Sequence, residues 1–127
     1  MIERISPPGA PAPRGPYSPA VRAGDFIFVS GQVAVDPATQ QLVTGDIATE
    51  TRQVLNNVKA LIEACGATLA DVVKCGVFLA DGNDFAAMNA VYAEFFGTAK
   101  PARATVVTGF AVPGIHVEIE AIAYKPQ

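Results

Sequence analysis

The chain has 127 residues, and only 17% of them are charged, against about 25% in an average domain. One histidine and two cysteines cannot supply a four-ligand Cys/His zinc site or an iron–sulfur cluster on four thiolates. A net charge of −3 with no basic run argues against nucleic acid and against an anionic membrane surface as partners. The length predicts a single domain spanning residues 1–127.

Residues 1–19 are expected to form a proline-rich, extended lead-in, because six of the ten prolines lie between Pro7 and Pro19. The first residues contain no apolar core of a signal peptide, and no apolar run approaches the ~20 residues of a membrane span. Cys65 and Cys75 stand alone in apolar stretches and are expected to be buried thiols. These features predict a cytoplasmic protein.

The next part of the chain predicts a hairpin followed by an amphipathic helix. Strands over 20–23 and 26–35 flank a Gly24-Asp25 turn, and a short extended piece follows at 42–43. From Asp46 to Cys65 the apolar residues recur at helical spacing, with Asp46 as the N-cap and Gly66 just beyond the end.

The second half predicts strand, helix, strand and strand. A buried strand covers 72–80, and a helix begins near Asp81 or Asn83 and ends at Gly97. Its apolar stripe is Phe85, Met88, Val91, Tyr92, Phe95 and Phe96. Strands over 102–107 and 115–124 complete the chain.

This order, β-β-α-β-α-β-β, predicts an α+β layer in which two helices cover only one face of a sheet. The strands at 26–29, 72–79 and 104–107 are nevertheless apolar on both alternations. The second face must therefore be buried against something the chain does not contain, and we expect a homo-oligomer whose sheets pack together.

Alternation along the last strand places His116, Glu118 and Glu120 on that second face, opposite an apolar stripe from Ile115 to Ala123. Charged groups there must be paired, solvated or functional. A wet rim, or pairing with basic residues across an interface, would account for both glutamates, and His116 would serve as a surface or hydrogen-bonded residue.

Two further positions each allow two interpretations, one structural and one functional. Arg103 begins an apolar strand, where it is either solvated or, facing the inner face, able to clamp a carboxylate with two hydrogen bonds. Ser30-Gly31 follows a buried strand and marks either a β-bulge or a close approach of the backbone to a ligand.

Several separate motifs resemble one family in register along nearly the whole chain. They are GPYSPAV, FVSGQVAVDP, LNNVKALIEACG, NAVYAEFFG, PARATV and VEIEAIA. Together they resemble the reactive intermediate/imine deaminase family, RidA, also called YjgF-like.

The resemblance implies a chorismate-mutase-like α+β fold with two helices on one face of a mixed sheet. It also implies a homotrimer, in which the sheets form a central β-barrel and three clefts between neighbouring subunits bind small carboxylates. The implied reaction is that of a 2-iminobutanoate/2-iminopropanoate deaminase. Such a hydrolase converts enamine or imine intermediates such as 2-aminoacrylate, released by pyridoxal-phosphate-dependent dehydratases, to a 2-oxo acid and ammonia. Neither a metal nor a cofactor is implied, because water needs only to be positioned at an electrophilic carbon.

The resemblance also implies roles for individual residues. Arg103 would bind the substrate carboxylate, and Glu118 would orient and activate the attacking water. Residues implied to line the cleft are Tyr17, Ser30, Gly31, Asn89 and Thr105. Thr105 stands where many family members carry cysteine, so a backbone contact at this position would survive while any thiol chemistry would not.

Three other functions stay open at the level of sequence. The chain could be a non-catalytic trimer that binds small carboxylates in a regulatory role, or a specialised catabolic deaminase acting on a larger amino-dienoate. A nuclease or translation inhibitor is the third, and the negative charge and single histidine speak against it.

Overall fold

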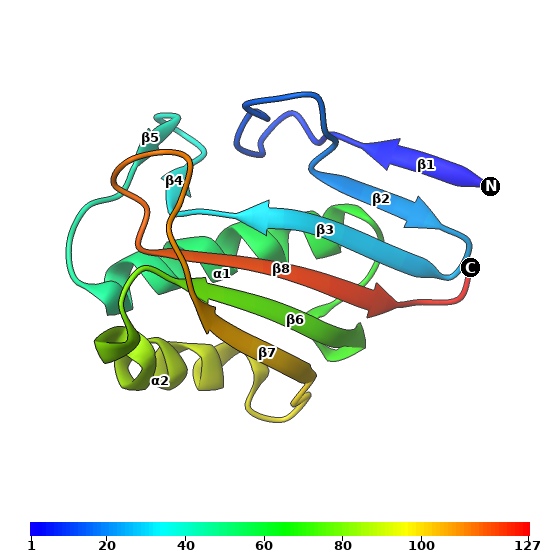
Figure 1. The fold of residues 1–127 in the computed structure, drawn as a ribbon. Coiled ribbons are helices and arrows are strands. Elements are labelled where there is room, and N and C mark those ends of the chain that lie inside the picture. The colour runs from blue at the N-terminus through cyan, green and yellow to red at the C-terminus, as the bar shows by residue number, and fades with distance from the viewer.

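The computed structural model describes all 127 residues, and it forms one six-stranded sheet with two helices packed on one face (Figure 1). The strands follow the order β1-β2-β3-β8-β6-β7. Their bounds are β1 Ile2–Ile5, β2 Ala20–Ala23, β3 Phe26–Gln32, β6 Val72–Leu79, β7 Ala102–Val107 and β8 Val117–Tyr124. Two short strands, β4 (Val35–Asp36) and β5 (Gln41–Leu42), form a separate pair. The mixed α+β architecture with helices on one face is as predicted.

The first helix, α1 (Ile47–Ala64), has the predicted ends. The Asp46 carboxylate accepts a hydrogen bond of 2.8 Å from the Thr49 amide, and Gly66 takes the left-handed conformation just beyond the last turn, with φ +86°. Its apolar stripe, Val54, Leu55, Val58, Leu61 and Ile62, is buried against β3 and β8. Most of the core therefore lies between α1 and the centre of the sheet.

The second helix, α2 (Phe85–Phe96), connects β6 to β7, which run parallel. A short 3₁₀ turn, Gly82–Asp84, precedes it and is capped by the side chain of Asp81. One member of the predicted apolar stripe departs from it, because Phe85 is 45% exposed, whereas Phe95 is partly buried and packs against the core. Phe85 is the first residue of α2, and its ring lies beside Arg103. Neither helix is both long and apolar enough to cross a membrane.

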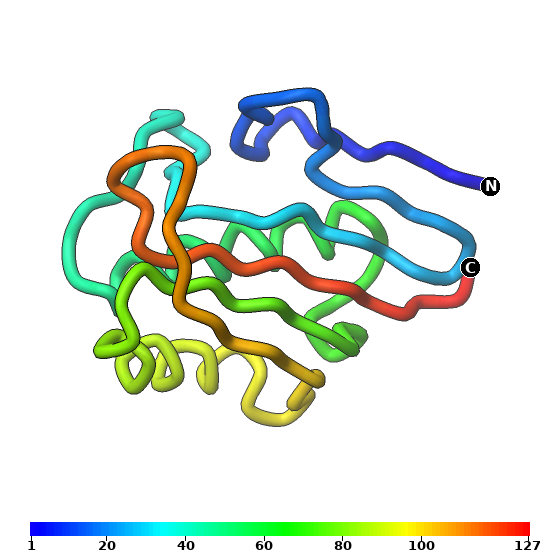
Figure 2. Tube along the Cα trace, viewed as in Figure 1, coloured from blue at the N-terminus to red at the C-terminus, as the bar shows by residue number.

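Within the extended lead-in, β1 pairs antiparallel with β2 as an edge strand. Two sequence expectations need correction. The strand expected over 26–35 ends at Gln32, and its register with β8 shifts between Val29 and Gln32, so Ser30-Gly31 forms a bulge. The last strand begins at Val117 rather than Ile115, because the preceding residues belong to a loop (Figure 2).

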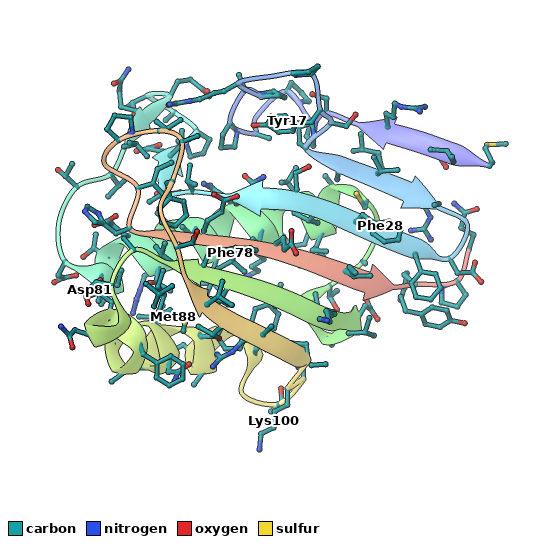
Figure 3. The ribbon with its side chains drawn as sticks, viewed as in Figure 1. Tyr17, Phe28, Phe78, Asp81, Met88 and Lys100 are labelled. Atoms are coloured by element: carbon teal, nitrogen blue, oxygen red, sulfur yellow. The ribbon has the colours of Figure 1, made fainter.

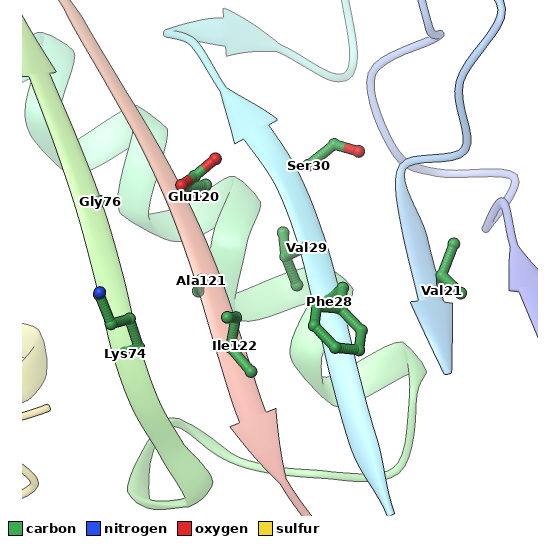
Figure 4. Close-up of a pocket in the computed structure, with 9 residues that line it drawn as sticks. All are labelled: Val21, Phe28, Val29, Ser30, Lys74, Gly76, Glu120, Ala121 and Ile122. Atoms are coloured by element: carbon green, nitrogen blue, oxygen red, sulfur yellow. The ribbon is translucent and has the colours of Figure 1, made fainter. Parts of the chain in front are cut away.

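One face of the sheet is uncovered within the chain, as predicted from the two-sided apolar strands. Large side chains lie partly or largely exposed on it: Phe26, Phe28, Phe78, Val106, Ile122 and Tyr124. A shallow hollow of about 310 Å³ lies among them, with Lys74, Glu120 and Phe28 around it and α1 behind the sheet (Figure 4).

Candidate functional site

Four of the residues singled out from the sequence lie together where the lead-in meets the end of β3, beside the start of β8. The Ser30 hydroxyl donates a hydrogen bond of 2.6 Å to the carbonyl of Ser18, and the Ser30 amide donates one of 2.9 Å to the carbonyl of Pro19. These bonds fix the end of the lead-in against β3. Tyr17, just before this point, is half exposed on the lead-in (Figure 3).

Glu118 lies against Gly31 in the same region. A Cβ built on Gly31 would come within 2.1 Å of Glu118 Oε2, so the carboxylate occupies the space that a side chain at position 31 would take. The bulge at Ser30-Gly31 and the room left by glycine thus belong to one arrangement. We call Tyr17, Ser30, Gly31 and Glu118 the lead-in half-site. A small cavity of about 50 Å³ beside it is lined by Arg14, Tyr17 and Gly31 among others.

The surroundings of Glu118 change the pKa of its carboxyl group. Burial, and then the negative charge of the neighbouring Glu120, raise the pKa of Glu118 above its ordinary value. Such a carboxylate holds a proton more readily than a solvated one, which suits a group that accepts a proton from water and returns it.

The remaining predicted residues lie at the other edge of the sheet. Arg103 and Asn89 line a pocket of about 360 Å³ between α2 and the start of β7. Thr105 follows on the same side of β7, and its hydroxyl oxygen is buried without a hydrogen-bond partner. We call Asn89, Arg103 and Thr105 the arginine half-site.

The chain does not bring Arg103 and Glu118 together, and the inner-face alternative considered for Arg103 is wrong. Arg103 pairs with the buried Cys75 and points to the helix side, whereas Glu118 pairs with Phe78 on the uncovered side. Arg103 lies on β7 and Glu118 on β8, with β6 between them, and the register offsets the two residues by three positions along the strands. Standard sheet spacings then put their Cα atoms about 14 Å apart.

His116 was also expected beside Glu118 and Glu120, and this expectation is wrong as well. His116 precedes β8, and its Nδ1 lies 2.9 Å from Oε1 of the buried Glu50 on α1. It thus satisfies a buried carboxylate, in line with the hydrogen-bonded role considered from the sequence. No group of three or more His, Cys, Asp or Glu side chains is placed to hold a metal ion.

The sequence reasoning missed the aromatic surroundings of Arg103. Its guanidinium carbon lies 4.7 Å from the ring centroid of Tyr92 and 5.7 Å from that of Phe85. Phe85, Asn89 and Tyr92 are spaced i, i+4, i+7 along α2 and so share one side of the helix. This spacing could have indicated that Phe85 and Tyr92 lie beside Asn89, but the sequence analysis places both in the apolar stripe of the helix.

A family model described as Endoribonuclease L-PSP matches residues 8–125. The chain belongs to this family. It is the YjgF/RidA family that the sequence motifs resemble. The chain is 54% identical over 125 residues to a RutC family protein of Pyrococcus horikoshii, covering 98% of this chain and 99% of the relative. It is 46% identical to a 2-iminobutanoate/2-iminopropanoate deaminase of Capra hircus, covering 98% and 92%.

Solved structures agree with the fold. The chain superposes on E. coli TdcF with bound serine with a TM-score of 0.90 at 37% identity, covering 97% of this chain and 98% of the other.

Proposed function

We propose that this protein hydrolyses small 2-imino acids, and the enamines that tautomerise to them, to 2-oxo acids and ammonia. The observation that carries the proposal is the unpaired charge of Arg103. This side chain lines an open pocket and forms no ion pair within the chain, so its guanidinium is available to a ligand carboxylate. The name of the goat relative and the serine bound to E. coli TdcF support the same substrate class.

The proposed chemistry needs one base and one anchor. Arg103 holds the substrate carboxylate, and Glu118 takes a proton from water while the water oxygen bonds to the imine carbon and the C=N π electrons move to nitrogen. Glu118 then returns the proton to the nitrogen of the tetrahedral intermediate. The carbon–nitrogen bond then breaks as Glu118 passes the proton of the remaining hydroxyl to the departing nitrogen, so that ammonia leaves and the 2-oxo acid forms. Water is the nucleophile throughout, so no cofactor takes part.

This chemistry requires the lead-in half-site of one chain to meet the arginine half-site of another, because a single chain holds them about 14 Å apart on opposite faces. We therefore propose a homotrimer in which the uncovered sheet faces pack together as a central barrel. The exposed Phe26, Phe28 and Tyr124 on that face favour such burial. Light scattering is expected to give the mass of three chains at micromolar concentration, and a monomer would contradict the proposal.

The activity is tested by adding the protein to a serine or threonine dehydratase reaction and following 2-oxo acid formation. Wild-type protein is expected to accelerate it, and Arg103→Ala is expected to remove the acceleration while leaving the trimer intact. Arg52→Ala is the matched control, because Arg52 forms an exposed ion pair with Glu94 and belongs to neither half-site. Equal rates with and without wild-type protein would contradict the deaminase function.

The sharing of the site between subunits has its own test. Arg103→Ala and Glu118→Ala chains, each inactive alone, are refolded together. In a closed ring each mixed trimer regains about one intact site in three, where an unchanged Arg103 faces an unchanged Glu118. Activity in the mixture supports the shared site, and its absence despite mixed trimers contradicts it.

Two other outcomes would redirect the assignment. Tight binding of a 2-oxo acid without turnover indicates a carboxylate-binding protein. RNA cleavage that weakens with salt would favour the activity in the family description, although the charge of −3 and the pairing of His116 with Glu50 argue against it.

A further inference from the structure

The surroundings of Arg103 differ from those of the other buried or half-buried arginine in the sheet. Arg22 donates hydrogen bonds to the carbonyls of Cys65 and Lys125, whereas Arg103 makes no hydrogen bond to a carbonyl or a carboxylate. Its guanidinium carbon lies 4.7 Å from the ring centroid of Tyr92 and 5.7 Å from that of Phe85. These two aromatic side chains therefore border the guanidinium.

The two rings have different environments. Tyr92 is 8% exposed, and its hydroxyl is buried beside Cys75. Burial, and then the neighbouring Cys75, raise the pKa of the Tyr92 hydroxyl far above its ordinary value, so the ring stays neutral. Phe85 is 45% exposed at the start of α2, where it fills no core position. Tyr92 therefore forms the inner wall beside Arg103, and Phe85 forms the outer wall.

Contact with an aromatic face leaves the edge of a guanidinium free. The five N–H donors of arginine lie in its plane, and a carboxylate binds to two of them along one edge. An aromatic ring attracts the cation across the flat face, so stacking and carboxylate binding do not compete. Asn89, between the two aromatics on the same side of α2, lines the same pocket.

We propose that Phe85 and Tyr92 are positioning residues, which hold the Arg103 guanidinium in the orientation that receives the ligand carboxylate. The proposal rests on the proposed function, in which Arg103 binds that carboxylate. It also accounts for Phe85, an exposed phenylalanine on a helix whose other large apolar residues lie in or against the core.

The consequence for ligands is measured as the Kd for 2-oxobutanoate, by calorimetric titration of the intact protein. Phe85→Leu keeps an apolar residue of similar size but removes the ring, and it is expected to weaken binding about two- to fivefold with little change in Tm. Phe95→Leu is the matched control on α2, since Phe95 packs against the core and is not one of the rings beside Arg103.

The positioning itself is measured without ligand. In the NMR spectrum of the wild-type protein, the Arg103 side-chain protons are expected to show upfield ring-current shifts, which Phe85→Leu reduces and Phe95→Leu does not. Side-chain shifts of a freely solvated arginine would overturn the proposal whatever the protein binds, as would wild-type affinity in Phe85→Leu. Ring-current shifts in a protein that fails to bind 2-oxobutanoate would support the positioning and overturn the proposed function instead.

Discussion

Replacing Gly31 by alanine is expected to displace the proposed water-activating carboxylate without unfolding the protein. A Cβ at position 31 would lie 2.1 Å from Oε2 of Glu118 and 2.9 Å from its Cδ, where an ordinary contact requires 3.4 Å or more. The carboxylate must therefore move by about 1.3 Å. It can do so at little cost to the fold, because the contact is with the far end of a flexible side chain and the φ of Gly31 lies outside the left-handed region.

The expected effect on activity is much larger than the effect on stability. Misplacing a reacting group by about 1 Å costs on the order of 10²-fold, or about 2.7 kcal/mol of activation free energy. We expect kcat/KM in the dehydratase-coupled assay to fall by about that factor, while the unfolding free energy changes by less than about 1 kcal/mol.

Gly76→Ala supplies the matched control for Gly31→Ala. A Cβ at position 76 would lie 2.8 Å from Oε2 of Glu120, a similar crowding on the same face of the sheet against a carboxylate that the proposed chemistry does not use. This variant is expected to retain activity within about threefold of wild type, with the oligomeric state of both variants checked by light scattering. A trimeric Gly31→Ala protein with wild-type kcat/KM would refute the role given to the Glu118 carboxylate.

Three further predictions concern charge. Because Glu120 helps to raise the pKa of Glu118 and a general base must be ionised, Glu120→Gln is expected to move the acid limb of the pH–rate profile to lower pH; an unmoved limb would contradict the coupling. A pKa raised in the folded state favours the protonated carboxyl, so wild type loses stability relative to Glu118→Gln as pH rises through that pKa. Glu118→Gln should accordingly show the higher Tm at pH 7, with the difference closing below about pH 4. Arg22→Ala removes the donor to the carbonyls of Cys65 and Lys125 and should cost about 2–4 kcal/mol in denaturant unfolding, and a loss below about 1 kcal/mol would contradict this.

Elements with local signals were predicted closely. The ends of α1 follow from Asp46 as an acceptor for the first turn and from Gly66 in a conformation that other residues rarely adopt. The bounds of β7 follow from Pro101 before it and from its run of β-branched residues. In each case the signal and the structure it specifies lie within a few residues of each other.

Features set by pairing between distant strands were not predictable in this way. Alternation groups the residues of one strand by face, but it does not say which group of one strand shares a face with which group of the next. The pairing of Arg103 with Cys75 decides the side for Arg103, and no local pattern encodes that register. His116 was placed on the wrong face for a related reason. It lies just outside β8, and the alternation of that strand does not extend to it.

In the proposed trimer, a second chain would both cover the open sheet face and complete the divided site. A site completed within one chain would need Arg103 and Glu118 on the same face, yet the β6–β7 register gives them opposite faces. Placing Arg103 on the uncovered face instead would remove it from Phe85 and Tyr92. In the proposed trimer, the interface that buries the open face also carries the lead-in half-site of one chain to the arginine half-site of the next. Loss of the trimer is therefore expected to abolish activity even where every named side chain is intact.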